Sequence, residues 1–539
     1  MKASIRQKLS PIAEQDQNEG IQKKFDLDKQ RSKQFAYELG GIYADFSKTH
    51  ISQALLDVYT EFATEIGFEE QRHQLFSGAK INCTENRSVL HTLLRDSDNQ
   101  GIEAQEKGVI AQAKESEQQL DTRYQEIIDA ISKRAHPVTD IIHVGIGGSS
   151  LGTQLLFEAL VDLNASINVH FISNVDAHKL VSVLQSCDVK STLVIGVSKT
   201  FTTAETLQNI NTIGKWFDQN GVQDWKSEIY AVTSYPANAI EFGVKEQHIV
   251  GFPEWVGGRY SVWSAVSLSA MIVIGIDKFK EFLAGASLTD QHFYQTPLEQ
   301  NICFLAAMLD HYYANFLNVQ SRAIFAYDHR LRSLVDYLQQ LETESNGKDR
   351  QRDGNPVDQP TSVVVWGGVG TDVQHSVFQM MHQGTSLIPS EFTLVKQAEH
   401  DLDDHHQELL ANGLAQTAAL LSGQSLETVK SLNEGKELSD LTLKSKIFSG
   451  ERPSTTFLVE KLTPYALGIL LAFYEHRTFC GGVFANINSY DQMGVELGKR
   501  LAKSIRPLLD GELSEQDEER IKSSFDASTL SLLKRVLSK

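Results

Sequence analysis

Short apolar runs that alternate with helical patterns are the feature that most limits the folds open to this chain. Such runs occur at residues 140–148 (DIIHVGIGG), 167–176 (INVHFISNVD), 191–200 (STLVIGVSKT) and 228–234 (EIYAVTS). Strands that alternate with helices favour a parallel sheet covered by helices on both faces. We therefore predict an α/β unit in this part of the chain.

A second α/β unit is predicted further along. Long helical patterns dominate residues 260–340, and the alternation then returns at RAIFAYD, SVVVWGG and TTFLVEKL. The length of 539 residues also calls for more than one domain, since a domain typically has roughly 100–200 residues. We expect a helical segment at 1–110 that packs on the second α/β domain, α/β domains at 111–285 and 286–500, and a helical C-terminal arm at 501–539.

Charge and composition exclude some classes of partner. The formal net charge is −19, which disfavours a general nucleic-acid binder or a protein of anionic membrane surfaces. The longest apolar runs are shorter than a membrane span, and the first residues lack the apolar core of a secretory signal. The four cysteines lie far apart and form no CxxC motif, which suits small buried residues in a reducing compartment. We expect a cytoplasmic protein that binds neither nucleic acid nor membranes.

A glycine turn follows the first predicted strand, in VGIGGSSLG (Val144–Gly152). Free backbone N–H groups at such a turn, where a helix begins, suit a phosphate. The glycines also fit part of a dinucleotide fingerprint, with Asp176 as the ribose ligand, but Ser150 replaces the third glycine. The letters GSSLG match the GxSxG nucleophile elbow of hydrolases, with Ser150 as the nucleophile. A tight turn without a ligand is the fourth interpretation.

A second loop favours the phosphate interpretation. The segment SKTFTTAET follows another apolar strand and supplies five polar donors: Ser198, Lys199, Thr200, Thr202 and Thr203. Hydroxyl groups and a lysine beside a helix N-terminus suit a phosphate group. Thr202 and Glu205 also form a capping box, so we expect Thr202 to cap the helix while its neighbours bind. Two such loops after strands of one sheet predict one phosphate site at the carboxyl edge of that sheet.

Three other segments offer groups for catalysis. Arg259 follows two glycines in EWVGGRYSVW, a context that predicts a guanidinium presented into a cavity rather than a surface loop. His382 lies in the last turn of a predicted helix, where a histidine otherwise serves as a capping cation. Gln492 and Lys499 are seven residues apart, two turns along one helix face, although Lys499 on its own reads as solvated. The segment HDLDDHH (400–406) fits no metal-site spacing and predicts a solvated helix face.

Taken together, these segments resemble the glucose-6-phosphate isomerase (phosphoglucose isomerase) family. The matching stretches are AKINCTENRSVLHTLLR, GIGGSSLG, SKTFTTAET, EWVGGRYSVWSA, ESNGK, GTDVQHSVFQMMHQGT and INSYDQMGVELGK, in family order. The resemblance implies two sugar-isomerase (SIS) α/β sandwich domains in tandem, a helical N-terminal segment, a C-terminal arm and a homodimer. It implies a sugar phosphate substrate and neither a cofactor nor a metal.

The resemblance also implies roles for single residues. The phosphate would be held by Ser198, Lys199, Thr200 and Thr203, with Gly148 and Ser149 lining the site. Glu344 of ESNGK would move a proton between C2 and C1 of the sugar. Arg259 would stabilise the enediolate. Glu342 and Glu344 lie near the end of a predicted helix. Glu342 is expected to be a solvated surface residue. Asn346-Gly347 is expected to end the helix in a left-handed turn.

Ring opening would use residues from later segments. His382 of the partner subunit would assist it, and Lys499 would act in ring opening or bind sugar hydroxyls. Gln340 and Gln492 would position the substrate. The chain differs from residues that are common in the family at Ser150, Asn86 and the segment SYDQMG. None of these differences removes a catalytic group. A non-catalytic SIS-type sugar-phosphate sensor and an isomerase that also accepts mannose 6-phosphate are the alternatives.

Overall fold

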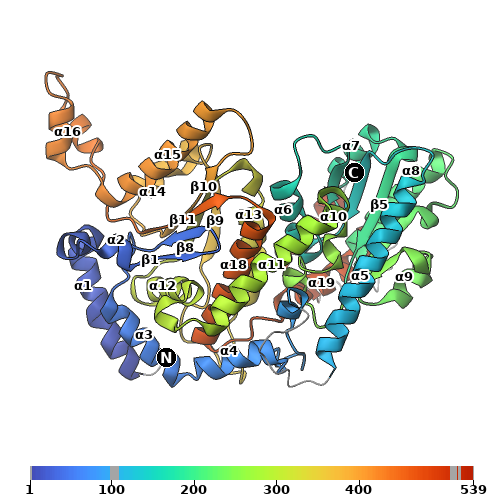
Figure 1. Ribbon diagram of the computed structural model, residues 1–539, viewed down its shortest axis with the longest axis horizontal. Helices are drawn as coiled ribbons and strands as arrows, with labels where there is room; N and C mark the ends of the chain where they lie inside the picture. Colours follow the sequence, from blue (N-terminus) through green and yellow to red (C-terminus); the bar gives the residue numbers. More distant parts are fainter. Residues whose placement is uncertain (1–2, 97–107, 510–518, 520–523, 538–539) are drawn as a thin grey trace. The chain divides into compact units, whose positions relative to one another are not determined.

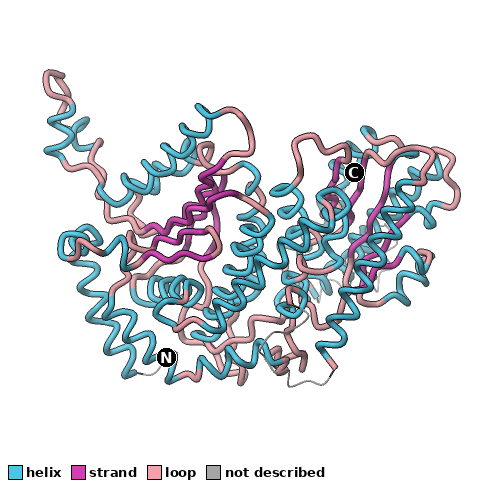
Figure 2. Tube along the Cα trace, in the orientation of Figure 1, coloured by secondary structure: helices cyan, strands magenta, loops and turns pink. Residues whose placement is uncertain are grey.

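The computed structural model describes residues 3–96, 108–509, 519 and 524–537. The chain forms two compact units, Met1–Ser489 and Tyr490–Lys539. The first unit holds two separate groups of strands, drawn in magenta in Figure 2. This arrangement confirms the predicted fold class, an α/β protein with two sheets that contain parallel strands. The division of the first unit at residue 285 stays a prediction.

The first sheet has five parallel strands in the order β4-β3-β5-β6-β7. The strands are β3 (Asp140–Val144), β4 (Asn168–Ile172), β5 (Thr192–Val197), β6 (Ile229–Thr233) and β7 (Ile249–Gly251). The connecting helices are α6 (Leu151–Leu160), α7 (Ala177–Ser186), α8 (Ala204–Gln219) and α9 (Pro236–Phe242). Every residue of β5 is buried, as expected for a strand with helices on both faces. The carboxyl ends of β3 and β5 therefore meet at one edge, where the two predicted phosphate loops follow.

The second sheet has six strands in the order β1-β2-β11-β10-β8-β9. Its parallel part consists of β8 (Ser321–Tyr327), β9 (Val364–Val369), β10 (Ser390–Gln397) and β11 (Ser454–Lys461). Phe325, Phe378, Phe392 and Leu394 belong to the buried core between this sheet and its helices. The helices that follow these strands include α13 (Leu334–Leu338), the π-helix η10 (Gln339–Glu344), α14 (Gln374–Gln383) and α15 (Asp403–Ser422).

The N-terminal segment is not wholly helical, which corrects the prediction for 1–110. Strands β1 (Ala36–Leu39) and β2 (Ile42–Asp45) form an antiparallel hairpin, and β2 pairs with β11 of the second sheet. Gly40 and Gly41 form the two-residue turn with φ values of 54° and 85°. Two consecutive positive φ angles fit the hairpin turn whose twist matches that of the strands. The N-terminal segment thus extends the second sheet.

Helices surround and join these sheets (Figure 1). The N-terminal ones are α1 (Ala3–Leu27), α2 (Arg31–Gln34), α3 (Gln53–Glu65), α4 (Phe68–Ser77) and α5 (Val109–Ser132). The later ones are α10 (Leu268–Ile274), α11 (Ile276–Gln295), α12 (Ile302–Phe316), α16 (Leu426–Leu432), α17 (Asp440–Ser445) and α18 (Pro464–Ala485). Helix α18 is buried along most of its length and packs against α11 and α12. These three helices form an apolar core of the first unit.

The second unit is helical where it is described. It contains the short turn η11 (Met493–Val495), α19 (Glu496–Leu509) and α21 (Ala527–Leu537). Leu497, Leu501 and Leu532 are exposed within this unit. No helix in the described part of the chain combines the length and the apolar character needed to cross a membrane.

Candidate active site

The first glycine loop lies against the loop that carries Arg259. The turn η2 (Gly147–Ser149) follows β3, and Gly147 has a φ of 58°. A Cβ atom on Gly148 would lie 2.2 Å from the carbonyl carbon of Gly258, so only glycine permits this approach of the two backbones. Ser261 Oγ donates a hydrogen bond of 3.1 Å to the Gly148 carbonyl oxygen. The predicted phosphate turn and the predicted cation loop are therefore joined.

A buried histidine, His143, also holds this glycine turn in place. His143 Nε2 lies 2.7 Å from the Ser149 carbonyl oxygen, and His143 Nδ1 lies 2.7 Å from Ser269 Oγ. Because a carbonyl oxygen only accepts, Nε2 carries the proton and Nδ1 accepts from the serine hydroxyl. Burial lowers the pKa of His143 to about 4, so the imidazole is neutral at neutral pH. Sequence reasoning missed this residue, because it reads as one more position of an apolar strand.

Two rival interpretations of the first loop do not fit the structure. Ser150 is fully buried, and its Oγ has no hydrogen-bond partner among the described residues. A hydrolase nucleophile requires an adjacent base and access to substrate, so the nucleophile-elbow interpretation is wrong. Asp176 caps helix α7, where its carboxylate accepts from the His178 backbone N–H at 2.9 Å. The acid of the dinucleotide hypothesis thus already serves as a helix cap.

The second loop gathers the predicted hydroxyl groups at the start of α8. Ser198 Oγ lies 3.0 Å from Thr203 Oγ1 and accepts from the Phe201 backbone N–H. Thr203 is the N-cap of α8 and makes no capping bond with its side chain. The expectation that Thr202 caps this helix is wrong, because its hydroxyl lies 2.7 Å from Thr200 Oγ1 instead. The first N–H groups of α8 therefore have no side-chain cap, the state in which a helix N-terminus suits an anion.

Lys199 links this loop to the segment that precedes Arg259. Its Nζ donates to the backbone carbonyl oxygens of Glu254 at 2.7 Å and Val256 at 3.0 Å. Burial, with the positive charge of Arg87 second, lowers the pKa of Lys199 to about 8. A partly desolvated ammonium group beside free helix N–H groups gains from a bound dianion. The loop is therefore equipped to bind phosphate.

Arg259 is buried, and hydrogen bonds to Ser345 and Ser489 hold its guanidinium group. Its Nε donates to Ser345 Oγ at 2.7 Å, and its Nη2 donates to the Ser489 carbonyl oxygen at 2.6 Å. The Tyr260 hydroxyl lies 2.9 Å from the same Ser345 Oγ. These contacts orient the guanidinium, and its Nη1 lies 3.6 Å from Glu344 Oε2. The predicted cation in a cavity and the predicted base are thus brought together.

Glu344 is the last residue of the π-helix η10. Its Oε2 accepts a hydrogen bond of 2.9 Å from Gln340 Nε2, so these two side chains lie together. The Glu344 side chain is 21% exposed, whereas that of Arg259 is 3% exposed. The carboxylate therefore lies at the rim of the site, within reach of a ligand. π-helical turns occur frequently at functional sites, and no sequence signal had indicated one here.

The helix ends differently from the expectation. Neither Asn346 nor Gly347 has a positive φ, so the predicted left-handed turn is wrong. The Gly347 N–H donates to the Thr343 carbonyl oxygen, and a Cβ atom on Gly347 would lie 2.4 Å from that oxygen. Asn346 donates to the Thr478 carbonyl oxygen at 2.8 Å and accepts from Ser489 Oγ at 2.7 Å. Close packing requires the glycine, and Asn346 fastens the helix end to α18.

Glu342 is buried, which corrects its prediction as a solvated surface acid. Its carboxylate pairs with Arg322, which also pairs with Asp310 and Glu391. A second arginine, Arg477, contacts the last two acids at 2.6 Å each. Burial raises the pKa of Glu342. The two acids of this helix end therefore have different surroundings: one is fixed in an internal charge cluster, and the other faces the site.

Three further predicted residues, His382, Gln492 and Lys499, are divided between the two units of the chain. His382 is the penultimate residue of helix α14, where its Nε2 lies 3.0 Å from Gln416 Oε1 and its ring packs near Phe448. Gln492 and Lys499 belong to the second unit, where Lys499 Nζ pairs with Glu496 at 3.1 Å. Helix α19 begins only at Glu496, so the expectation that Gln492 and Lys499 share one helical face is wrong.

Comparison with known proteins identifies the family. The family model described as Phosphoglucose isomerase matches residues 45–533. A glucose-6-phosphate isomerase from Rhizorhabdus wittichii is 42% identical over 515 residues, which cover 95% of this chain and 95% of that protein. One from Novosphingobium aromaticivorans is 44% identical, covering 86% of this chain and 87% of its own. The crystal structure of a glucose-6-phosphate isomerase from Chlamydia trachomatis superposes with a TM-score of 0.82 at 28% identity, over 96% and 98% of the two chains. The chain belongs to the phosphoglucose isomerase family.

Proposed function

We propose that this chain catalyses the reversible interconversion of glucose 6-phosphate and fructose 6-phosphate. The observation that carries the proposal is the partly exposed Glu344 carboxylate beside the buried, fixed guanidinium of Arg259. The Arg259 loop also touches the glycine turn at the carboxyl edge of the first sheet. A ligand with a phosphate at this edge could present its other end to Glu344.

The phosphate would be bound by the two loops of the first sheet. Ser198, Thr200 and Thr203 supply hydroxyl groups, and Lys199 supplies a charge beside the N-terminus of α8. Gly148 and Ser149 would line the opposite side of the same group. Together these donors select a phosphorylated substrate over a neutral sugar.

Glu344 would move the proton. Aldose–ketose isomerisation removes a proton from one carbon beside a carbonyl group and returns it to the next carbon. One carboxylate can perform both steps when it faces a planar enediolate, and such acid–base catalysis contributes roughly 10²–10⁴ in rate. Arg259 would stabilise the negative charge that develops on the enediolate oxygens, because its position is already set before the reaction. The overall reaction is redox-neutral, since the proton and both electrons stay within one substrate.

Ring opening would require further groups, because the substrate is a cyclic sugar phosphate in solution. We assign this step to His382 of the partner subunit in a homodimer and to Lys499. Gln340 would position the substrate, since its amide already contacts the base, and Gln492 would also position it. We place the activity in the cytoplasm, where sugar phosphates are metabolised.

A coupled assay tests the proposal. Fructose 6-phosphate is supplied, and the glucose 6-phosphate formed is followed through a dehydrogenase that reduces a nicotinamide cofactor. We expect turnover with glucose 6-phosphate and fructose 6-phosphate and, in a parallel assay, little with mannose 6-phosphate. A folded protein that binds glucose 6-phosphate without turnover would contradict the proposal and support a non-catalytic sugar-phosphate sensor. Comparable turnover of mannose 6-phosphate would support a bifunctional isomerase.

A further inference from the structure

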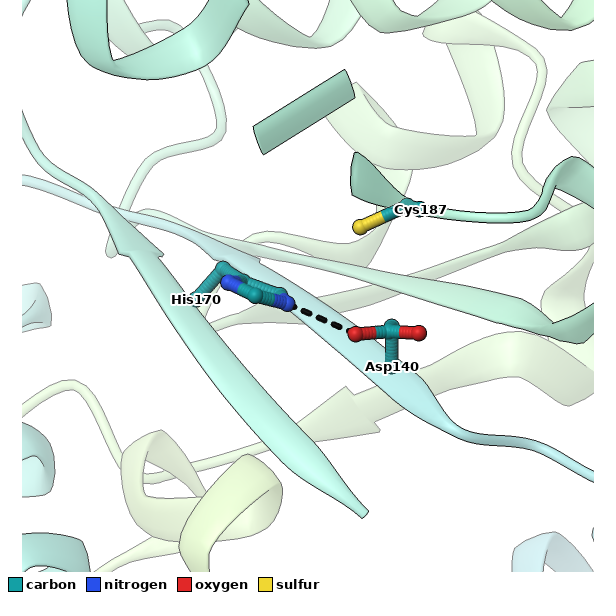
Figure 3. A group of neighbouring side chains, drawn as sticks. All are labelled: Asp140, His170 and Cys187. Carbon is teal, nitrogen blue, oxygen red and sulfur yellow. Dashed lines mark hydrogen bonds and ion pairs between the residues drawn. The ribbon is translucent and has the colours of Figure 1, made fainter. Parts of the chain in front are cut away.

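Three potential metal ligands from separate segments meet at the other end of the first sheet (Figure 3). Asp140 begins β3, His170 lies within the neighbouring strand β4, and Cys187 follows helix α7. One ligand atom from each, a carboxylate oxygen, a ring nitrogen and a thiol sulfur, lies within 4.8 Å of the other two. All three residues are partly buried, so none of them is fully shielded from solvent.

The contacts within this group show how it is held. His170 Nε2 lies 2.8 Å from one oxygen of Asp140, the bond drawn in Figure 3. Thr139 Oγ1 donates to the second oxygen of Asp140 at 2.8 Å.

We propose that Asp140, His170 and Cys187 bind a divalent zinc-like cation. Zinc accepts this mixture of oxygen, nitrogen and sulfur ligands, and three protein ligands leave a fourth tetrahedral position for water. The cation replaces the thiol proton, which is released to solvent, and a metal–sulfur bond forms. The His170 ring proton shifts from Nε2 to Nδ1, so that Nε2 can coordinate. The charges of a carboxylate and a thiolate then balance the two charges of the cation.

The site is separate from the proposed catalytic centre. Asp140 is the first residue of β3, whereas the Gly147–Ser149 turn follows the last. A strand rises roughly 3.3 Å per residue, so the two ends of β3 are about 13 Å apart. The cation would clamp β3, β4 and the end of α7, and its role would be stability of the sheet edge. Removing it should leave turnover unchanged.

Titration of the chelator-treated full chain with Co²⁺ tests the site. Cobalt occupies zinc sites, and a coordinated thiolate gives a charge-transfer absorption in the near ultraviolet. We expect this band to saturate at one equivalent, with release of one proton, and to vanish when Zn²⁺ is added. Cys187→Ser and His170→Gln should remove the band and weaken Zn²⁺ binding by more than the roughly tenfold to hundredfold typical of losing an outer-shell partner.

The control is Cys83→Ser, because Cys83 is exposed and lies outside the group. This variant should keep the full cobalt band, and Zn²⁺ should raise its Tm as it does for the unaltered chain. Absorption without a thiolate band, or a band that survives Cys187→Ser, would overturn the proposal. Activity in the presence of chelator is measured in parallel. We expect the same turnover with and without chelator. Normal turnover without a cobalt band would therefore reject only the metal site, and a cobalt band without turnover would reject only the proposed isomerase activity.

Discussion

Arg259 Nη1 lies 3.6 Å from Glu344 Oε2, farther than the two oxygens that accept hydrogen bonds from the same guanidinium group. Bonds to Ser345 Oγ and the Ser489 carbonyl oxygen fix the arginine. Glu344 can therefore take up and return a proton while the cation stays in position. This separation suits a base whose charge changes during the reaction, next to a cation whose charge does not.

Arg259→Lys keeps the positive charge but removes the planar fork that contacts Ser345 and Ser489. We expect kcat to fall roughly 10²–10³-fold, the range for losing a preorganised group at a developing oxyanion, with a smaller change in KM. Steady-state kinetics in both directions measure the effect. Arg123→Lys, in helix α5, is the matched control and should leave kcat unchanged. Near-normal kcat in Arg259→Lys would show that the geometry of the guanidinium is unimportant.

Substrate affinity should depend on the charge of Lys199. Since the pKa of this lysine in the free protein is about 8, the side chain is charged below that pH and loses its proton above it. KM for the sugar phosphate should therefore rise as pH increases through 8. Lys199→Arg should flatten the profile in this window, because arginine stays protonated. A rise in KM of equal size in both proteins would assign the pH dependence to another group.

The buried charge cluster around Arg322 makes a prediction about stability. Three carboxylates, Asp310, Glu342 and Glu391, share two arginines, Arg322 and Arg477. Arg322→Met leaves Glu342 without its arginine, and breaking a buried pair in this way costs about 3–5 kcal/mol. Glu342→Gln leaves two acids and two arginines, so its cost should be much smaller. Urea unfolding measures both.

The folding stability of the same charge cluster should also depend on pH. Burial raises the pKa of Glu342 in the folded protein, so the stability linked to its protonation is present at low pH and is lost as pH rises through that raised pKa. Glu342→Gln should therefore gain stability relative to the unaltered chain as pH increases from mildly acidic to neutral. A difference between the two proteins that stays constant with pH would contradict this assignment.

A shared active site predicts complementation between inactive subunits. If His382 acts in the partner's site, mixing His382→Ala with Glu344→Gln subunits creates heterodimers with one intact site. Random exchange should restore about a quarter of the normal activity, as expected for a two-fold dimer. Mixing Arg259→Ala with Glu344→Gln is the matched control and should restore none, because both residues come from one subunit. No recovery in the first mixture, with exchange confirmed by mass, would place His382 elsewhere.

Much of the fold could be predicted because its signals are local. Buried parallel strands such as β5 are continuous apolar runs, and the glycine turns follow them directly. The β1–β2 hairpin was missed although Gly40-Gly41 is a recognised hairpin signal. Its pairing with β11 joins residues near 44 to residues near 457, and no local pattern carries such a long-range contact.

The site was predictable to a lesser degree. Arg259 and Glu344 stand out through their flanking residues, but their contact depends on a loop and a helix end that meet only in the folded chain. The burial of Glu342 depends on Arg322, and the orientation of Ser149 on His143. Arg322 and His143 lie in strands β8 and β3, outside the helix end and the turn that they contact. The local helical pattern around Glu342 therefore suggested a surface residue. The π-helical turn at Gln339–Glu344 likewise has no signal in its own letters.

Glu344→Gln is the substitution that tests most directly whether this carboxylate moves the proton. The change keeps the size of the side chain and removes its basicity. We predict that kcat falls by at least about a hundredfold, while calorimetric titration shows that glucose 6-phosphate still binds. Glu427→Gln, an exposed acid in helix α16, is the control and should keep full activity. Near-normal turnover in Glu344→Gln would contradict the mechanism and show that another residue is the base.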